Sequence, residues 1–184
     1  MSKHRTPSTK FLCYVLRHHP EVIGLRLDAQ GWADIEELVL QLKRYGRTVT
    51  RQAIDRIITA DPKGRFALSD DGRRIRANYG HSISVDLGLD DAEPPEYLYH
   101  GTSTRFLDDI RDRGLQPMGR VYVHLSETHE AALEVGRRHG PPLVLVVGTG
   151  RMHRDGFRFH RAGRATWLTK EIPVKYLVFP DNPE

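Results

Sequence analysis

Apolar residues recur every three or four positions in the first sixty residues, which is the spacing of helices with one buried face. This pattern predicts three helices. Ser8 and Thr50 are good N-caps for the first and third, and acidic residues such as Asp34 lie at the start of the second, where a helix carries partial positive charge. Pro20 ends the first helix because proline cannot continue one. Residues 22–27 alternate enough to predict a strand or an extended link.

Two alternating segments, residues 65–69 and 73–77, flank an Asp-Asp-Gly sequence at 70–72. Asp-Gly between alternating segments is a strong signal for a β-hairpin. Three helices followed by a hairpin is the element order of a winged helix, and four arginines lie on this wing. A nucleic-acid-binding role would suit that fold and charge, although winged helices also bind proteins.

The pattern changes after residues 86–96, an acidic stretch with a Pro-Pro pair that we interpret as a linker. Short apolar segments then alternate with two helical ones. Strands are predicted at 97–100, 121–125, 143–147, 157–160, 166–168 and 176–179, and helices at 106–113 and 130–138. The continuous apolar run at 143–147 is typical of a strand buried on both faces. The sequence predicts an α+β fold with domains at 1–85 and 97–184.

Composition limits the class of protein. The 184 residues contain one cysteine, Cys13, which fits a reducing compartment and lies among the apolar residues of the first helix. No apolar run is long enough for a membrane span and no apolar signal core follows residues 1–5, so we expect a cytoplasmic protein. Residues 1–80 contain 15 basic and 9 acidic side chains, and residues 81–184 contain 13 and 15. This asymmetry favours contact between the first half and a polyanion.

Histidines and arginines are the candidates for chemistry. Arg17 and His18 fall in the last turn of the first helix, where cations are favourable in any protein. His100 and His124 occupy strand positions, and Gly101 beside His100 could let a ligand approach the backbone. A metal site is not expected, because carboxylates and thiols do not cluster near these histidines. Common nucleotide-binding loops are absent, and the Gly-Thr-Gly at 148–150 has no clear helix after it.

Six segments together resemble the RNA 2'-phosphotransferases of the Tpt1/KptA type. They are LRHHP at 16–20, DPKGRFAL at 61–68, IRANYGHS at 75–82, YHGT at 99–102, RVYVHLS at 120–126 and VGRRHG at 135–140. They occur in the order of the family and span nearly the whole chain. A seventh segment, 162–168, departs from the family pattern: Trp167 and Leu168 match, whereas Thr166 stands where valine is usual.

The resemblance implies an N-terminal winged-helix lobe and a C-terminal ADP-ribosyltransferase-like lobe that binds NAD+. It implies removal of an internal RNA 2'-phosphate, as at a tRNA splice junction, in two steps. The 2'-phosphate first attacks the ribose C1'' of NAD+ and expels nicotinamide, giving an ADP-ribosylated RNA 2'-phosphate. The ribose 2''-hydroxyl then attacks that phosphate and releases 2'-hydroxyl RNA and ADP-ribose 1'',2''-cyclic phosphate. Arginine forks suit such phosphate chemistry.

The resemblance also implies the site residues. The residues around the transferred phosphate would be Arg17, His18, Arg65 and Arg120, with His18 as a proton or hydrogen-bond donor in the second step. The NAD+ pocket would contain His100, Gly101, Thr102, His124 and Ser126. The phosphate residues come from both lobes, so the reaction is expected in a cleft between them. We expect RNA and NAD+ as partners, no metal, no membrane contact and a monomer.

Two other classes of function stay open. One is a winged-helix protein whose second lobe senses NAD+ or ADP-ribose without turnover. The other is an ADP-ribosyltransferase that modifies a protein or another nucleic-acid phosphate. The arginines in three separate segments favour phosphate chemistry, because a binding protein would not need them there. Glu171 follows Trp167 and Leu168 too late to match the acidic residue of many protein ADP-ribosyltransferases.

Overall fold

Two units form along the chain in the computed structural model, which describes residues 7–180. The first unit ends at Gly88 and the second begins at Leu89, so the division falls inside the predicted linker at 86–96. Residues 1–6 and 181–184, at the outer ends of the two predicted domains, lie outside the described residues. Each unit combines helices and strands, and the fold is therefore α+β.

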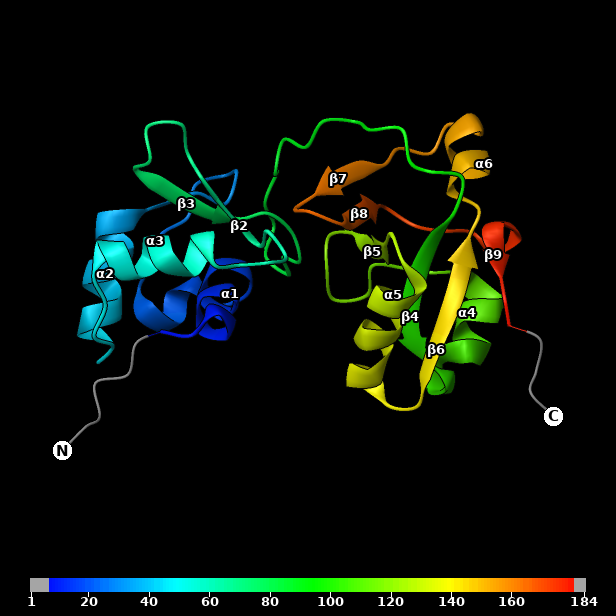
Figure 1. The fold of residues 1–184 in the computed structure, drawn as a ribbon, viewed down its shortest axis with the longest axis horizontal. Coiled ribbons are helices and arrows are strands. Elements are labelled where there is room, and N and C mark those ends of the chain that lie inside the picture. Colours follow the sequence, from blue (N-terminus) through cyan, green and yellow to red (C-terminus); the bar gives the residue numbers. More distant parts are fainter. Residues whose placement is uncertain (1–6, 181–184) are drawn as a thin grey trace. The chain divides into compact units, whose positions relative to one another are not determined.

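The first unit contains the three predicted helices (Figure 1): α1 (Thr9–Arg17), α2 (Ile35–Arg44) and α3 (Arg51–Thr59). Side-chain caps explain where they start. The Ser8 hydroxyl accepts a hydrogen bond from the Phe11 N–H at 3.2 Å, and Thr50 caps α3 in the same way. Asp34 is the N-cap of α2, where its carboxylate accepts from the Glu37 N–H at 2.9 Å. Local signals thus set all three helix starts.

The backbone after α1 does not form the strand predicted at 22–27. A short 3-10 helix, η1 (Pro20–Ile23), forms instead, and irregular backbone follows it. Pro20 has the φ angle that a helical turn needs at its first position. Gly24, at φ +68°, ends the turn in the left-handed region that glycine tolerates.

The predicted hairpin is confirmed as β2 (Phe66–Leu68) paired with β3 (Arg74–Ala77), with Phe66 opposite Ala77. A two-residue strand, β1 (Ala33–Asp34), pairs with the other side of β3 and was not predicted, because so short a segment carries no periodicity. The helices and hairpin enclose one apolar core. Its fully buried members include Leu12, Leu16, Ile35, Leu38, Leu42, Ile54 and Ile75.

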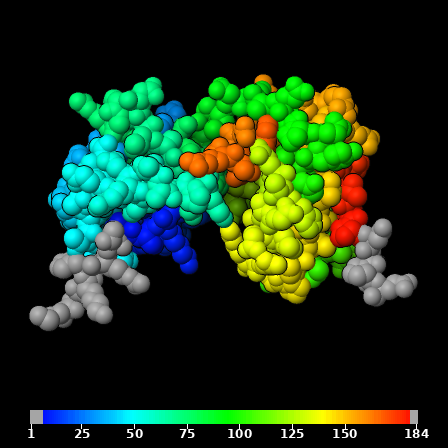
Figure 2. Space-filling model, in the orientation of Figure 1, coloured from blue at the N-terminus to red at the C-terminus, as the bar shows by residue number. Residues whose placement is uncertain are grey.

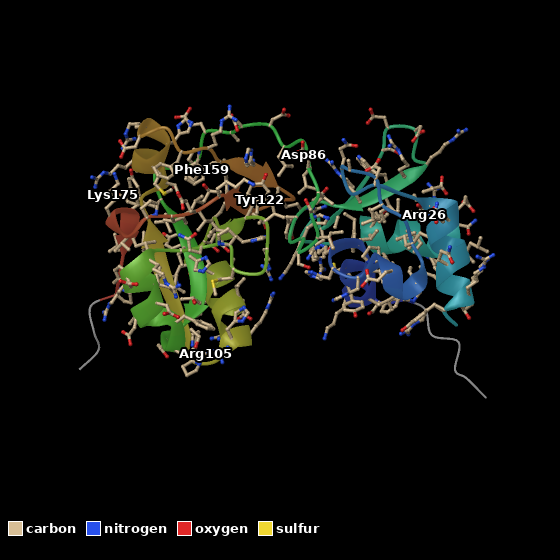
Figure 3. All side chains as sticks on the ribbon, turned by 180° about the vertical axis from the view of Figure 1, so that it is seen from behind. Arg26, Asp86, Arg105, Tyr122, Phe159 and Lys175 are labelled. Carbon is tan, nitrogen blue, oxygen red and sulfur yellow. The ribbon has the colours of Figure 1, made fainter. Side chains whose placement is uncertain are left out.

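The second unit is built on a six-stranded sheet of order β7-β8-β5-β4-β6-β9. Its strands are β4 (Leu98–Ser103), β5 (Val123–Ser126), β6 (Pro142–Val147), β7 (His160–Ala162), β8 (Thr166–Thr169) and β9 (Leu177–Val178). Helix α5 (His129–Gly136) lies along β4 and β6 (Figure 1). Helices α4 (Leu107–Arg113) and α6 (Thr149–Arg154) contribute Ile110 and Met152 to the core of this unit. Phe159, labelled in Figure 3, is fully buried in that core.

Several details of this unit differ from the sequence predictions. Helix α6 begins at Thr149, within the Gly-Thr-Gly segment, so the expectation of no clear helix there was wrong; six residues are too few for a clear apolar period. The strand predicted at 157–160 forms later, at His160–Ala162. In β6, Leu145 and Val147 are buried, but Val144 and Val146 are partly exposed. That strand is therefore not buried on both faces.

The end of the predicted linker is attached to the second unit. The Ala92 N–H donates to the Phe159 carbonyl at 2.8 Å, and the Thr149 hydroxyl donates to the Pro95 carbonyl at 2.6 Å. Glu96 forms an ion pair with Arg154 at 2.9 Å. Among residues 7–180, no helix is both long and apolar enough to cross a bilayer.

Candidate functional site

Arg17, the last residue of α1, lies with its guanidinium carbon 4.9 Å from the centre of the Tyr79 ring. Its Nε and Nη2 atoms are buried and have no hydrogen-bond partner among the described residues. Gly80 makes this approach possible, because a Cβ there would lie 3.2 Å from Nη1 of Arg17, and its φ of +87° also favours glycine. A half-buried guanidinium with two unused donors is suited to pair with an anion such as phosphate.

His18 caps the end of α1 and is held by the segment that follows β3. Its Nδ1 atom shares a hydrogen bond of 2.9 Å with the Ser82 hydroxyl. The Ser82 N–H also donates to the Arg17 carbonyl at 3.1 Å, which ties this segment to the helix end. The contact fixes the imidazole through one ring nitrogen and directs Nε2 to the opposite side.

Arg65, the third predicted phosphate residue of this unit, is paired with a buried acid. The Asp61 side chain is 1% exposed and accepts from Nε of Arg65 at 2.9 Å and from Nη2 at 2.5 Å. The other carboxylate oxygen accepts from the Arg65 backbone N–H at 2.5 Å. This arrangement uses one edge of the guanidinium and sets its direction. Arg65 also lines a pocket of about 340 Å³ with residues of α1 and α3, although neither Arg17 nor His18 lines that pocket.

Tyr79 connects these cations. Its ring lies under Arg17, and its hydroxyl donates to the Lys63 carbonyl at 3.2 Å, two residues before Arg65. The charges of both arginines also act on the thiol of Cys13. Burial raises the pKa of this thiol, while the charges of Arg17 and Arg65 oppose that rise. The thiol therefore stays protonated at neutral pH, as expected of a core cysteine. The first unit thus brings Arg17, His18 and Arg65 into one cationic cluster.

His81 is buried beside this cluster, with 2% of its surface exposed. Burial, followed by the positive charges of Arg17, His18 and Arg76, lowers its pKa from 6.5 to about 4. His81 is therefore neutral at physiological pH and adds no further charge to the cluster.

This lowered pKa predicts acid sensitivity. Between pH 6.5 and 4 the unfolded chain binds a proton at His81 that the native protein does not, so stability falls as the pH falls. The loss between pH 7 and pH 4 is expected to reach about 3 kcal/mol. Urea unfolding at both pH values checks it. The His81→Gln variant should lack this part of the pH dependence, and an equal dependence in both proteins would contradict the prediction.

The predicted NAD+ residues lie on β4 and β5 of the second unit. The Nδ1–H of His100 donates to the His124 carbonyl at 3.0 Å, which leaves Nε2 of His100 as an acceptor. Burial is the main cause that lowers the pKa of His100, and the positive charges of His139 and Arg120 add to it, so the ring is neutral. Arg120 itself is exposed in the turn before β5. Its effect on His100 places its charge near this part of the sheet.

Strand alternation separates the five predicted NAD+ residues. Tyr99 lies opposite Ser126, so Ser126 and His124 share the face of Tyr99. His100 and Thr102 point to the other face, where Leu145 lies opposite His100. The structure therefore joins His100 and His124 through a backbone hydrogen bond but does not gather all five side chains on one surface.

Gly101 has a packing role in the sheet, and its expected contact with a ligand stays a prediction. A Cβ at this position would lie 1.7 Å from the carbonyl oxygen of Ala132 in α5. Glycine is required because the helix backbone crosses β4 directly here.

Gly101→Ala is accordingly expected to destabilise the protein, at the upper end of about 1–3 kcal/mol, because backbone atoms of α5 must move. Gly119→Ala is the matched control, since a Cβ at Gly119 meets nothing within 4 Å. Thermal unfolding of the two variants checks the difference. Equal melting temperatures would show that α5 can move at no cost.

Sequence reasoning assigned no role to Asp61, Tyr79, His81 or Ser82, which surround the cations of the first unit. All four belong to the segments that carry the family resemblance, so membership of those segments was the available signal. Their contacts join residues far apart in the chain and were not visible in any local pattern. Among residues 7–180, no three His, Cys, Asp or Glu side chains are grouped so that they could hold a metal ion.

Comparisons with known proteins agree with one another over most of the chain. A family model described as RNA 2'-phosphotransferase, Tpt1 / KptA family, matches residues 3–171. A "Probable RNA 2'-phosphotransferase" of Agrobacterium fabrum is 50% identical over 172 residues, which cover 94% of this chain and 92% of that protein. Proteins of the same name from Pseudomonas aeruginosa and Burkholderia lata are 50% and 49% identical over 171 and 179 residues. These matches cover 92% and 97% of this chain, and 94% and 92% of the two relatives.

Proposed function

Because this chain belongs to the RNA 2'-phosphotransferase family of the Tpt1/KptA type, we propose that it removes an internal 2'-phosphate from RNA with NAD+ as co-substrate. The observation that carries the proposal is the cationic cluster of Arg17, His18 and Arg65 in the first unit. Two guanidinium groups and an imidazole match the charge and the hydrogen-bonding capacity of a phosphate dianion.

The proposed architecture is that of the family. The three helices and the β2–β3 hairpin support a winged-helix first lobe, and the six-stranded sheet supports an ADP-ribosyltransferase-like second lobe. Arg120 would join the phosphate residues from the second lobe. A shared cleft between lobes, a monomeric state and a cytoplasmic location remain predictions.

The side chains of the second unit fit NAD+ as a co-substrate. His100 is neutral and shares one face of β4 with the hydroxyl of Thr102, so these two side chains can bond to ribose hydroxyls and a carboxamide without repelling the positively charged nicotinamide. Ser126 lies on the other face of the sheet. NAD+ would supply the ribose carbon that receives the phosphate and the hydroxyl that later displaces the RNA. The chain's own contribution is to orient the 2'-phosphate and offset its charge, because a phosphate dianion is already a nucleophile at neutral pH.

The activity test uses a short RNA with one internal 2'-phosphate, incubated with and without NAD+. NAD+-dependent loss of the phosphate together with ADP-ribose 1'',2''-cyclic phosphate is the expected result. ADP-ribosylated RNA that accumulates without the cyclic product would favour an ADP-ribosyltransferase. NAD+ binding without any turnover would favour a sensor. Either of these two outcomes overturns the proposal.

The hydrogen bond between Ser82 and His18 gives a further prediction. Ser82→Ala should lower the rate of phosphate removal roughly tenfold, because a released imidazole adopts the productive orientation less often. The pH–rate profile should shift as well, since Nδ1 loses its partner, while NAD+ affinity stays unchanged. Ser82→Thr keeps the hydroxyl and should restore the profile. An unaltered rate and profile in Ser82→Ala would exclude this positioning role.

A further inference from the structure

A row of aromatic rings extends from the cationic cluster along α1. We call it the aromatic row, and its members are Phe11, Tyr14, His18, His19 and Tyr45. Consecutive ring centres are 6.4 Å apart for His18 and His19, then 4.7 Å to Tyr14, 6.2 Å to Phe11 and 5.6 Å to Tyr45. The last three rings are close to parallel, with interplanar angles of 27° and 23°. The row is therefore continuous, with stacked rings from Tyr14 through Phe11 to Tyr45 and tilted rings at the two histidines.

Part of this row faces solvent. Tyr14 is 40% exposed and Tyr45 is 46% exposed, although large apolar rings favour burial. Phe11 packs partly against the core of the first unit and anchors the middle of the row. Figure 2 shows the surface of α1, in blue, beside the cyan surface of the helices that follow it. Exposed rings on a fixed helix provide a rigid stacking surface at little entropic cost.

Positively charged side chains lie next to the aromatic row. The guanidinium of Arg47 lies 4.7 Å from the centre of the Phe11 ring. Lys43 and Arg44 lie in the last turn of α2, directly before Tyr45. The acidic contact of the row is Glu21, whose carboxylate lies 3.0 Å from Nδ1 of His19 and holds that ring. Aromatic rings combined with cations match a strand that has both flat bases and a phosphate backbone.

We propose that the aromatic row binds single-stranded RNA that flanks the reactive 2'-phosphate. A base stacks on the face of Tyr45 that Phe11 does not cover. A neighbouring base packs against the exposed edge of Tyr14, and Arg47 contacts the backbone. The inference rests on the proposed function, because His18 belongs both to the row and to the cationic cluster. From His18 to Phe11 the helix rises about 10 Å at 1.5 Å per residue. That length accommodates about three stacked bases at 3.4 Å each.

The test measures affinity for RNA by fluorescence anisotropy, with an end-labelled single-stranded oligonucleotide of eight residues that has no 2'-phosphate. Tyr14→Ala and Tyr45→Ala are each expected to weaken binding about tenfold. Tyr14→Phe keeps the ring and should bind like the unaltered protein. Tyr97→Ala is the matched control, because Tyr97 is 56% exposed but lies in the second unit outside the row. Unchanged affinity in both alanine variants, or an equal loss in Tyr97→Ala, would overturn the inference and leave the row as a surface for another partner.

A second measurement separates this inference from the proposed function. With 2'-phosphorylated substrates, the alanine variants should raise KM for an octanucleotide about tenfold but leave KM for a dinucleotide unchanged. An equal change for both lengths would overturn the aromatic row. If the unaltered protein turns over neither substrate, the proposed function fails, and the anisotropy experiment still decides whether the row binds RNA.

Discussion

Replacing Arg65 by alanine is expected to lower the rate of 2'-phosphate removal about a thousandfold, while the affinity for NAD+ changes by less than about twofold. Arg65 belongs to the cationic cluster of the first unit, whereas the candidate NAD+ residues lie on β4 and β5 of the second. Loss of a directed guanidinium should therefore affect the phosphate alone. Steady-state rates and calorimetric titration with NAD+ measure the two effects.

The controls for this prediction follow from the pair with Asp61. Arg65→Lys keeps the positive charge but not the fork, and should recover a small part of the rate. The double variant Asp61→Asn, Arg65→Ala removes the arginine without leaving an unpaired carboxylate. It should be folded and as inactive as Arg65→Ala. A folded variant that loses NAD+ affinity and activity equally would show that Arg65 does not act on the phosphate.

The same substitution is expected to lower the free energy of unfolding by about 3–5 kcal/mol, because it leaves a buried carboxylate without its partner. Asp61 is 1% exposed, and Arg65 supplies both its side-chain donors and one backbone donor. Adding Asp61→Asn should restore most of the loss, since a neutral amide costs less to bury. Urea unfolding at pH 7 of the single and double variants checks both statements.

The pH dependence of this pair has a defined sign. Burial raises the pKa of Asp61, but hydrogen bonds from the side chain and backbone of Arg65, together with its charge, outweigh burial and lower the pKa below its ordinary value. The contribution to stability is therefore complete above the pKa of the unfolded carboxyl and is lost as the pH falls through the folded one. Unaltered protein and Arg65→Ala should thus converge in stability at strongly acidic pH. A constant difference down to that range would contradict a charged pair.

The contacts around Arg17 explain why this cation is compatible with a stable helix end. The partial negative charge at the end of α1 stabilises the guanidinium, and the Tyr79 ring adds a further attraction. His81 stays neutral beside Arg17 and adds no repelling charge to the cluster. These contacts exist without a ligand, as the proposed phosphate-binding role requires.

Much of the fold was predictable from local residues. Ser8 and Thr50 start their helices through side chains three residues from the N–H groups that they accept from, and the Asp-Gly turn at 70–72 fixes the hairpin. Each of these signals acts within a few positions of the chain, so it is readable without the fold. The family likewise followed from short segments, because each segment can be matched without knowledge of the fold.

Other features depend on residues that meet only after folding. Helix α6 and strand β1 are too short to show a period, and η1 replaced a strand because Pro20 and Gly24 favour a turn. The close packing of α5 on Gly101 was likewise not readable from the sequence. Conformation in these places depends on packing between distant segments, which outweighs weak local preference.

The sequence by itself therefore determined the helices with strong caps, the hairpin, the family and the candidate cations. Only the tertiary structure decided that Asp61 holds Arg65, that Ser82 holds His18, and that His100 and His124 point to opposite faces of one sheet. The physical reason is the distance along the chain over which each interaction acts. Caps and turns act over a few residues, whereas burial, desolvation and the direction of a side chain depend on neighbours tens of residues away.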